Sequence, residues 1–400
     1  MKIVERVARV DQSKCVGCKN CERHCPTDAI KVTPGVMPGY VPPCGTACPA
    51  GTDVQGYIAL AGAGRYEDAY RLIRQSNPFP SVCGRICNHP CQAACNRNDL
   101  DESVGIRDIK RFVADKAFEN GMPVVEKKRK SNGKKIAVIG AGPSGLSCAY
   151  YLQLSGYSVE VFESESVAGG VLAYGIPEYR LPKAVLNRDI QAIEATGVQI
   201  HLNTTVGEDV SFDELYKKFH AVYVSTGTQL SRKADIPGED MPGVYHGLDF
   251  LKAVNLGKPV EIGKKVAVIG GGNTAIDAAR TARRLGAEVT IVYRRQRNDM
   301  PCEERELLEA FEEGVRVLDL AAPVEVVGEG KVQGLKCVRM VPGVKDEKLR
   351  RSTTKTEEEF VVEVDNIIVA VSQYSDFPFI NKDEVVVSKA GRIVLDEKGM

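Results

Sequence analysis

The sequence has no net charge and no long hydrophobic run, and each absence argues against a class of partner. Lysine plus arginine and aspartate plus glutamate number 53 each, which argues against nucleic acid or an anionic membrane as the main partner. The apolar runs are too short to span a membrane, and the start, MKIVERVARVDQ, is too charged for the core of a signal peptide. We therefore expect a cytoplasmic protein without membrane insertion. With 400 residues, 43% of them apolar, it should form two or three domains.

Cysteine is unevenly distributed. Ten of the thirteen cysteines lie between Cys15 and Cys95, and in a cytoplasmic chain such a group indicates metal ligation rather than disulfides. The first four have the spacing C-x2-C-x2-C-x3-C-P, which is the bacterial ferredoxin run that holds a [4Fe-4S] cluster. Zinc is the alternative, but zinc sites typically use two separated cysteine pairs. The candidate ligands of this run are Cys15, Cys18, Cys21 and Cys25.

Six more cysteines follow, in the spacings C-x3-C and C-x3-C-x3-C-x3-C. Pro90 prevents the last four from lying along one helix, so we expect them on a loop that curls around a cofactor. Helices are expected near residues 53–63, 66–75 and 106–119. Ten thiolates satisfy two [4Fe-4S] clusters with two left over, or three clusters only if two ligands come from elsewhere. The candidate ligands here are Cys44, Cys48, Cys83, Cys87, Cys91 and Cys95.

Residues 134–163 are typical of a dinucleotide site: a buried strand, a glycine-rich turn, a helix and a second strand. The first glycine of GAGPSG allows a tight turn, the second lets backbone amides approach a pyrophosphate, and the third lets the helix and strand pack closely. An acid at the end of the second strand can bind ribose hydroxyls. The candidate residues are Gly140, Gly142, Ser144, Gly145 and Glu163.

A second site of this kind opens with GGGNTA after a strand that begins near Lys265. Its second strand ends in two arginines where the first site has an acid, which favours the 2'-phosphate of NADP over NAD. A solvated basic turn is the alternative. The candidate residues are Gly270, Gly272, Asn273, Thr274, Ala275, Arg294 and Arg295.

The segments PCGTACPAGTD, NPFPSVCGRICNHPCQAAC and VGIRDIKRF resemble the iron-sulfur domain of the glutamate synthase small-subunit family, which is shared with dihydropyrimidine dehydrogenase and NADPH:ferredoxin bifurcating transhydrogenases. With the nucleotide motifs, the resemblance covers about residues 40–400. It implies that the first nucleotide site binds FAD and the second NAD(P). It also places further flavin contacts at Gly169, Gly170, Val171, Arg180, Val206, Thr226 and Gly227.

The sequence departs from this family at three places. Relatives have a C-x2-C pair shortly before the equivalent of Cys44, where this chain has GVMPGYVPP, and the ferredoxin run could supply the missing thiolates. A glutamine completes one cluster in dihydropyrimidine dehydrogenase, but the aligned residue here is Lys110, which cannot ligate while protonated; Cys83 could replace it. Relatives also continue past the equivalent of Met400 with a flavin-contacting Gly-Asp motif. We therefore expect a longer natural chain, or a partner that covers an incomplete flavin site.

The predicted fold class is α/β, with two Rossmann-like dinucleotide-binding domains preceded by a ferredoxin-like segment and a helical iron-sulfur domain. Residues 361–371 should form one strand that returns to the FAD domain, so the NAD(P) domain should be inserted in the FAD domain. The expected boundaries are 1–35 for the ferredoxin-like segment, 36–125 for the iron-sulfur domain, 134–250 and 360–400 for the FAD domain, and 251–359 for the NAD(P) domain.

These features predict an electron-transfer flavoprotein. NADPH and FAD would exchange a hydride, and [4Fe-4S] clusters would pass single electrons to or from a partner, such as ferredoxin or a hydrogenase, formate dehydrogenase or transhydrogenase module. The alternatives are a glutamate synthase small subunit and a non-catalytic scaffold that only holds clusters. Thiol exchange is not expected, because Cys148, Cys302 and Cys337 are too scattered to form a reactive pair and should be buried small residues. No catalytic residue is assigned, since hydride transfer needs orientation more than an acid or base.

Overall fold

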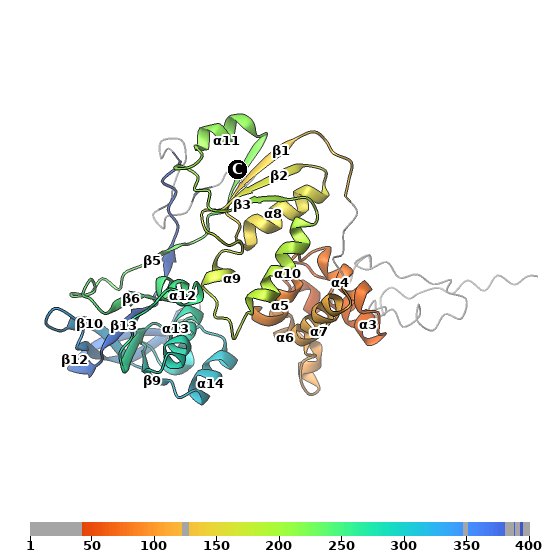
Figure 1. Cartoon of the computed structure of the whole chain (residues 1–400). Helices are drawn as coiled ribbons and strands as arrows, with labels where there is room; N and C mark the ends of the chain where they lie inside the picture. The colour runs from red at the N-terminus through yellow and green to blue at the C-terminus, as the bar shows by residue number, and fades with distance from the viewer. Residues whose placement is uncertain (1–41, 122–127, 347–350, 381–387, 389–392, 395–400) are drawn as a thin grey trace, which may run out of the picture. The chain divides into compact units, whose positions relative to one another are not determined.

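The computed structural model describes residues 42–121, 128–346, 351–380, 388 and 393–394 (Figure 1). The ferredoxin run with Cys15, Cys18, Cys21 and Cys25 lies outside these residues. The chain divides into two compact units. The first holds the described residues up to Lys134 with Leu146–Val159 and Arg180–Gln199, and the second holds Lys135–Gly145, Glu160–Tyr179 and the described residues from Ile200 onward. Every helix of the described residues is too short or too polar to cross a bilayer.

The first unit is helical. Its main helices are α3 (Val54–Gly62), α4 (Tyr66–Arg74), α5 (Pro80–Ile86), α7 (Ile106–Glu119) and α10 (Lys183–Glu194). The core lies between α3, α4 and α7, where Tyr57, Tyr70 and Val113 are fully buried, and α5 packs against both α7 and α10. The three helices expected between residues 53 and 119 are therefore confirmed.

Short elements connect these helices and carry most of the cysteines. They are α2 (Pro43–Thr46), α6 (Pro90–Ala93) and the 3-10 turn η1 (Asn96–Asp99). Proline begins α2, α5 and α6, a position where its missing amide costs nothing and its fixed φ suits the helix. The helical path is interrupted between α5 and α6, where His89 has a φ of +40°. As predicted, the four cysteines from Cys83 to Cys95 do not lie along one helix.

The first nucleotide motif folds into a four-stranded sheet with the order β3-β2-β1-β4. Its strands are β1 (Lys135–Ile139), β2 (Ser158–Phe162), β3 (Gln199–His201) and β4 (Ala221–Val224). β1 and β4 are parallel, with Ile136 opposite Ala221. The accompanying helices are α8 (Pro143–Leu154), α9 (Val171–Tyr174) and α11 (Phe212–Lys218). The strand-turn-helix-strand prediction for residues 134–163 is confirmed.

The second nucleotide motif lies in a parallel five-stranded sheet with the order β6-β13-β7-β8-β9. Its strands are β6 (Val244–His246), β7 (Lys265–Ile269), β8 (Glu288–Val292), β9 (Arg316–Leu318) and β13 (Asn366–Val369). The associated helical segments are α12 (Gly247–Asn255), α13 (Asn273–Arg284), η2 (Arg297–Asp299) and α14 (Glu304–Glu312). The expected strand-turn-helix-strand order around GGGNTA is present.

An antiparallel sheet of β10 (Ala321–Val327), β11 (Gly334–Lys345) and β12 (Arg351–Glu363) was not predicted. A second small sheet pairs β5 (Leu230–Ser231) with β14 (Gln373–Tyr374). The strand expected over residues 361–371 is two strands: β12 ends at Glu363 in the antiparallel sheet, and β13 pairs in parallel with β6 and β7. The second domain therefore extends beyond the predicted boundaries of 251–359 on both sides.

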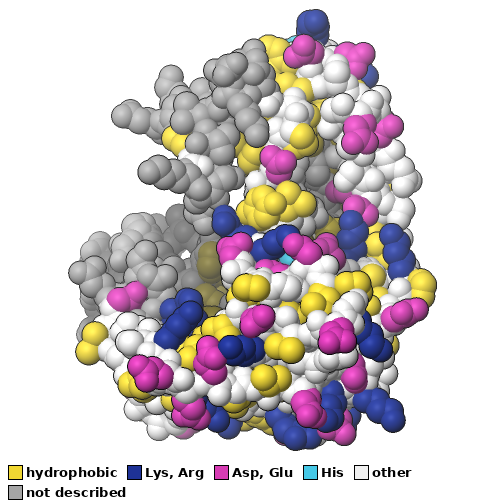
Figure 2. Space-filling view, turned by 90° about the vertical axis from the view of Figure 1, so that its left-hand side faces the viewer, with side chains coloured by type: hydrophobic (Ala, Val, Ile, Leu, Met, Phe, Trp, Pro, Cys, Tyr) yellow, Lys and Arg dark blue, Asp and Glu magenta, His cyan; other side chains and the backbone are white. Residues whose placement is uncertain are grey.

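The chain then returns to the first sheet. Phe379 packs against the core that contains Ala137, Phe162 and Phe219, and its ring lies 6.0 Å from that of Phe212. The second domain is thus an insertion, as expected, although β6, α12 and β13 belong to it rather than to the FAD domain. On the face in Figure 2, acidic and basic side chains are interspersed over the described residues, in line with the balanced composition.

Candidate functional site

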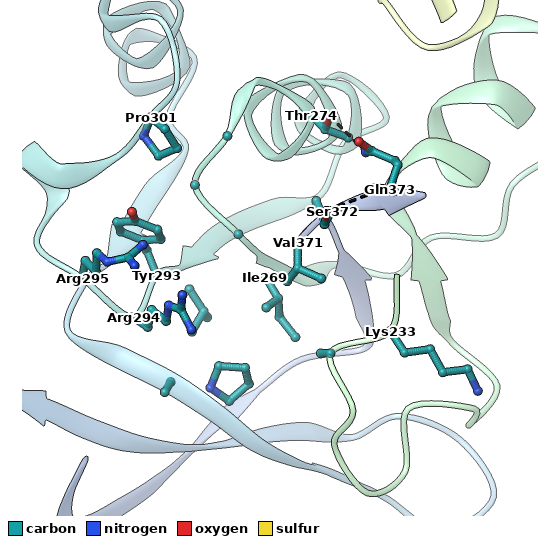
Figure 3. Close-up of a pocket in the computed structure, with 18 of the residues that line it drawn as sticks. Lys233, Ile269, Thr274, Tyr293, Arg294, Arg295, Pro301, Val371, Ser372 and Gln373 are labelled. Carbon is teal, nitrogen blue, oxygen red and sulfur yellow. Dashed lines mark hydrogen bonds between the residues drawn. The ribbon is translucent and has the colours of Figure 1, made fainter. Parts of the chain in front are cut away.

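A cavity of about 670 Å³ opens beside the glycine-rich turn that follows β7 (Figure 3). Gly270 has a φ of +139°, and a Cβ there would lie 2.3 Å from the carbonyl oxygen of Ala370, so only glycine fits. A Cβ at Gly272 would meet nothing within 4 Å, so the backbone there borders open space. The turn leads into the N-terminus of α13, where amide groups favour an anion. This geometry fits the pyrophosphate of a dinucleotide.

Two of the predicted nucleotide residues support this turn instead of lining the cavity. The side-chain oxygen of Asn273 accepts a hydrogen bond from the Glu303 amide at 2.9 Å, which ties the start of α13 to the segment before α14. Ala275 is fully buried behind the turn. The predicted residues that line the cavity are Gly270, Gly272, Thr274, Arg294 and Arg295.

Cations form one wall of the cavity. Arg294 and Arg295 follow β8 and lie on the same side of the cavity (Figure 3). The Nε of Arg295 donates to the backbone oxygen of Arg351 at 2.6 Å, which fixes its position. Lys355 of β12 also lines the cavity, and within the described part of the chain neither it nor Arg294 has a recorded acidic partner. Lys233 differs, because its ammonium pairs with Asp240 at 2.5 Å.

Lys355 was missed by the sequence analysis because its strand belongs to the antiparallel sheet. Ala322 and Pro323 of β10 line the same cavity, so this sheet contributes a wall that lies outside the strand-turn-helix motif. A run of alternating polar residues, RSTTKTEEEF, was the available signal for β12.

A smaller cavity of about 170 Å³ lies at the end of β1 and is lined by the turn that follows it. Gly140 has a φ of +101°, and a Cβ there would lie 2.5 Å from the backbone oxygen of Ser225. A Cβ at Gly145 would lie 2.0 Å from the Gly140 oxygen, whereas one at Gly142 would meet nothing within 4 Å. Gly140 and Gly145 are thus sterically required here, while the approach of a pyrophosphate at Gly142 stays a prediction. Thr226 also lines the cavity.

The hydroxyl of Thr226 is the observation that best indicates a ligand here. It is buried and has no hydrogen-bond partner in the described structure, and an unsatisfied buried polar group is costly unless something binds it. Val206 and Glu163 line the same cavity. The residues present therefore fit a bound flavin nucleotide at this turn.

Glu163 already has a structural role in this site. It is 5% exposed, and its two carboxylate oxygens accept hydrogen bonds from the amides of Ala141 at 2.7 Å and Glu165 at 2.9 Å. The carboxylate therefore braces the glycine-rich turn from the end of β2. Contact with ribose hydroxyls stays a prediction for this side chain.

The remaining predicted flavin residues are distributed around the turn. Gly169 donates to the Ala141 oxygen at 2.8 Å, and a Cβ at Gly170 would lie 2.9 Å from the Gly142 Cα, so this segment runs alongside the turn. Ser144, Val171 and Gly227 belong to the second unit but do not line the cavity, and Arg180 belongs to the first unit.

In the first unit, the six described candidate thiols fall into two groups. Burial raises the pKa of the Cys91 thiol, Lys110 lowers it, and the nearby Cys87 and Cys48 thiols raise it. Burial also raises the pKa of Cys83, and Cys87 is among the thiols that add to this effect. Burial raises the pKa of Cys44, and the nearby Cys95 thiol adds to this effect. We call Cys48, Cys83, Cys87 and Cys91 the first group and Cys44 and Cys95 the second; Tyr57 lies near Cys44 as well as near three thiols of the first group, so the two groups are adjacent.

The chemistry of these side chains fits a [4Fe-4S] cluster, because cysteine thiolates are its usual protein ligands. Within the described ranges, no three His, Cys, Asp or Glu side chains converge on one metal-ion position.

A buried lysine provides a second test of the fit. Lys110 is 7% exposed, its Nζ lies 5.7 Å from the centre of the Tyr57 ring, and the described residues include no recorded acidic partner for it. A buried ammonium needs a counter-charge, and cluster thiolates would provide one.

The other three described cysteines are not arranged for thiol exchange. Burial raises the pKa of Cys302 and of Cys337 to about 11, and it also raises the pKa of Cys148. All nine described cysteines are free. A raised pKa keeps these thiols protonated and unreactive, in line with the interpretation that they are packing residues.

Three family models match the sequence. The pyridine nucleotide-disulphide oxidoreductase family matches residues 134–400, the 4Fe-4S cluster domain II of dihydropyrimidine dehydrogenase matches residues 37–122, and a 4Fe-4S binding domain matches residues 8–31, which include the ferredoxin run. The predicted resemblance, the oxidoreductase class and the expected [4Fe-4S] and pyridine-nucleotide cofactors agree with these matches.

The chain is similar to subunits of several enzymes. The beta subunit of the NADPH-Fe(3+) oxidoreductase of Geobacter sulfurreducens is 43% identical over 351 residues, which cover 85% of this chain and 52% of that protein. The beta subunit of the NADP(+)-dependent formate dehydrogenase of Moorella thermoacetica is 42% identical over 386 residues, with 90% and 54% covered. The small chain of the NADPH glutamate synthase of Escherichia coli is 38% identical over 374 residues, with 89% and 79% covered. The chain thus spans about half the length of the first two relatives.

Solved structures share the fold. FprA from Mycobacterium tuberculosis in complex with NADPH matches with a TM-score of 0.56 and 22% identity, covering 66% of this chain and 76% of that one. The amine oxidase HisD from Pseudomonas geniculata matches with a TM-score of 0.51 and 18% identity, covering 82% and 45%. At these identities the likeness supports the α/β dinucleotide-binding fold.

Proposed function

Because the chain belongs to the pyridine nucleotide-disulphide oxidoreductase family, we propose that it exchanges a hydride between NADPH and FAD and passes single electrons through [4Fe-4S] clusters. A partner redox subunit supplies or receives these electrons. The observation that carries the proposal is the cavity beside the second glycine-rich turn, which combines a phosphate-binding backbone with three cations for which the described residues include no recorded acidic partner.

The cation wall selects the nucleotide. A 2'-phosphate brings negative charge to the end of β8, where Arg294, Arg295 and Lys355 line the cavity. Charge-assisted hydrogen bonds from guanidinium groups to phosphate are about twice as strong as neutral ones. NADH lacks this phosphate and gains none of them, so the site prefers NADPH.

The first turn binds the flavin nucleotide. Gly140 and Gly142 leave room for the pyrophosphate, Thr226 offers its unsatisfied hydroxyl, and Glu163 holds the turn in place. When bound, FAD supplies the chemistry that links two-electron hydride transfer to one-electron transfer. The protein's own part is to bind and orient, since no side chain is needed there as an acid or base.

The iron-sulfur ligands are the described cysteines of the first unit together with the ferredoxin run. Cys48, Cys83, Cys87 and Cys91 provide four thiols for one cluster. Cys44 and Cys95 provide two for another, which needs further ligands; the four cysteines before residue 26 are a source of these.

The partner is a second redox subunit. The first two relatives are named as beta subunits of an NADPH-Fe(3+) oxidoreductase and a formate dehydrogenase, which favours a module that feeds or drains electrons for another catalytic subunit. A glutamate synthase small subunit is the second candidate, because this chain covers 79% of the Escherichia coli small chain. The ferredoxin match at residues 8–31 favours the first candidate, since it adds a cluster-binding run.

The test uses the full chain purified without oxygen. We expect about eight or more iron atoms per chain, enough for two cubanes, and viologen reduction that is faster with NADPH than with NADH. A Cys87→Ser variant should lose iron and viologen reduction, whereas Cys148→Ser, which removes a cysteine outside the proposed ligands, should keep both.

Three results would argue against the proposal. Zinc in place of iron would remove the clusters, and iron without nucleotide-dependent reduction would indicate a scaffold. A glutamate synthase large chain co-purifying with the native protein, identified by mass spectrometry, would favour the second candidate.

A further inference from the structure

Lys110 is placed against the cluster cysteines by the close packing of two helices. It lies on α7, and α7 approaches α5 at Gly84, where a Cβ would be 2.7 Å from the Cα of Arg111. Only glycine permits this approach. Because α5 contains Cys83 and ends before Cys87, this contact holds α7, the helix of Lys110, against the helix of Cys83.

The charge of Lys110 acts on several of these thiols. Its ammonium lies within electrostatic reach of Cys48, Cys83 and Cys91. One ammonium therefore influences three of the four thiols in the group.

Lys116, on the same helix, differs from Lys110 in exposure and in its partner. The side chain of Lys116 is 39% exposed and pairs with Glu119 at 2.6 Å. Lys110 has the Tyr57 ring beside it and no recorded acid in the described structure. A charge in this position is expensive to bury unless an anion accompanies it.

We propose that Lys110 is the built-in counter-charge of the cluster held by Cys48, Cys83, Cys87 and Cys91, and that it raises the reduction potential of this cluster above that of the same cluster without it. The inference rests on the proposed function, because it requires a cluster at these thiols. Reduction adds one electron to the cluster and breaks no bond. A fixed positive charge stabilises the more negative reduced state more than the oxidised state, and burial strengthens the effect.

The consequence concerns the direction of electron flow. A cluster with a raised potential accepts electrons from its neighbours more readily than it returns them. Lys110 thus favours electron transfer onto this cluster over transfer away from it.

The test is a potentiometric titration of the holoprotein, followed by electron paramagnetic resonance of the reduced clusters. Lys110→Met removes the charge with little change of volume, Lys110→Arg keeps it, and Lys116→Met is the matched control on the same helix. We expect Lys110→Met to move the midpoint of one cluster to a more negative potential and leave the others unchanged. Lys110→Arg and Lys116→Met should keep the wild-type midpoints.

Iron content, measured first for every variant, separates the possible failures. A wild-type chain without iron would defeat the proposed function itself. Wild-type iron in Lys110→Met with unchanged midpoints would overturn only the present inference.

A loss of iron is informative as well. If Lys110→Met loses the cluster, Lys110→Gln is titrated in its place. If both neutral variants lose iron while Lys110→Arg keeps it, the positive charge holds the cluster, as proposed. Loss of iron from Lys110→Arg as well would mean that the shape of the lysine matters rather than its charge, and would refute the proposal.

Discussion

Replacing Asp189 with alanine should loosen the helix that carries Cys83. Asp189 is completely buried, and one carboxylate oxygen accepts hydrogen bonds from the amides of Ser81 at 3.0 Å and Val82 at 3.1 Å. The other oxygen accepts from the Ser81 hydroxyl at 2.8 Å. These amides belong to the first turn of α5, where they have no partner within the helix. A residue of α10 therefore completes the start of α5.

The size of the effect follows from the two amides left without a partner. Each unsatisfied buried donor costs about 1–3 kcal/mol, so the loss at α5 is roughly 2–6 kcal/mol. Domains are stable by only about 5–15 kcal/mol. The change should therefore open α5 locally, and Cys83 of α5 would lose its fixed position.

Hydrogen exchange followed by mass spectrometry measures this opening directly. It suits a chain of several domains, for which a single unfolding free energy is not defined. Since every 1.4 kcal/mol is tenfold, exchange in residues 80–86 should accelerate by roughly 30-fold to 10⁴-fold in Asp189→Ala. Ser81→Ala, which loses only the hydroxyl bond, should change exchange by about tenfold or less. Unchanged exchange at α5 in Asp189→Ala would refute the reasoning.

Three further predictions concern the nucleotide sites and pH. Arg294→Ala combined with Arg295→Ala should weaken NADPH binding by about 100-fold to 10⁴-fold, since two charge-assisted bonds of about 1.5–3 kcal/mol each are lost; calorimetry should show a much smaller change for NADH, and equal losses would contradict the assignment. Gly145→Ala should lower the flavin bound per chain, because its Cβ would lie 2.0 Å from the Gly140 oxygen, whereas Gly62→Ala, where a Cβ meets nothing within 4 Å, should keep wild-type flavin absorbance. Burial raises the pKa of Asp189 to about 7 from 3.8, so the folded state binds this proton more tightly. The stability that this raised pKa contributes is fully present below about pH 4 and is lost as the pH rises through about 7. Exchange at α5, corrected for intrinsic rates, should therefore increase from pH 5 to pH 8 in the wild type and depend less on pH in Asp189→Asn.

Local patterns were enough to locate the strands, turns and helices of the two nucleotide motifs. β1 and β8 are the strands that the two nucleotide motifs predicted before and after their turns and helices, and α7 lies where apolar residues at helical spacing placed it. The glycine roles were also predictable, because a positive φ and a close backbone contact depend on a few neighbouring residues. The cysteine spacing likewise indicated the cluster region before any contact was known.

The tertiary structure decided what depends on residues far apart in the chain. Local sequence does not determine which of the two nucleotide sheets β13 joins. Its pairing with β6 and β7 depends on strands that are distant in the chain. The antiparallel sheet brings Lys355 to the cavity beside the turn after β7. The alternating pattern of residues along β12 predicts a strand but not what that strand faces.

Two buried charged residues illustrate this difference between local sequence and tertiary packing. As sequence, Asp189 looks like an ordinary helix-surface residue, because charged side chains are usually solvated. The family resemblance marked the position of Lys110 but not its burial. Packing buried both: α7 approaches α5 at Gly84, and Asp189 meets Ser81 across 108 positions of sequence. Sequence spacing indicated where cofactors bind, but only the packing of distant segments determined which charges lie beside them. Burial is a property of the assembled core and not of any local pattern.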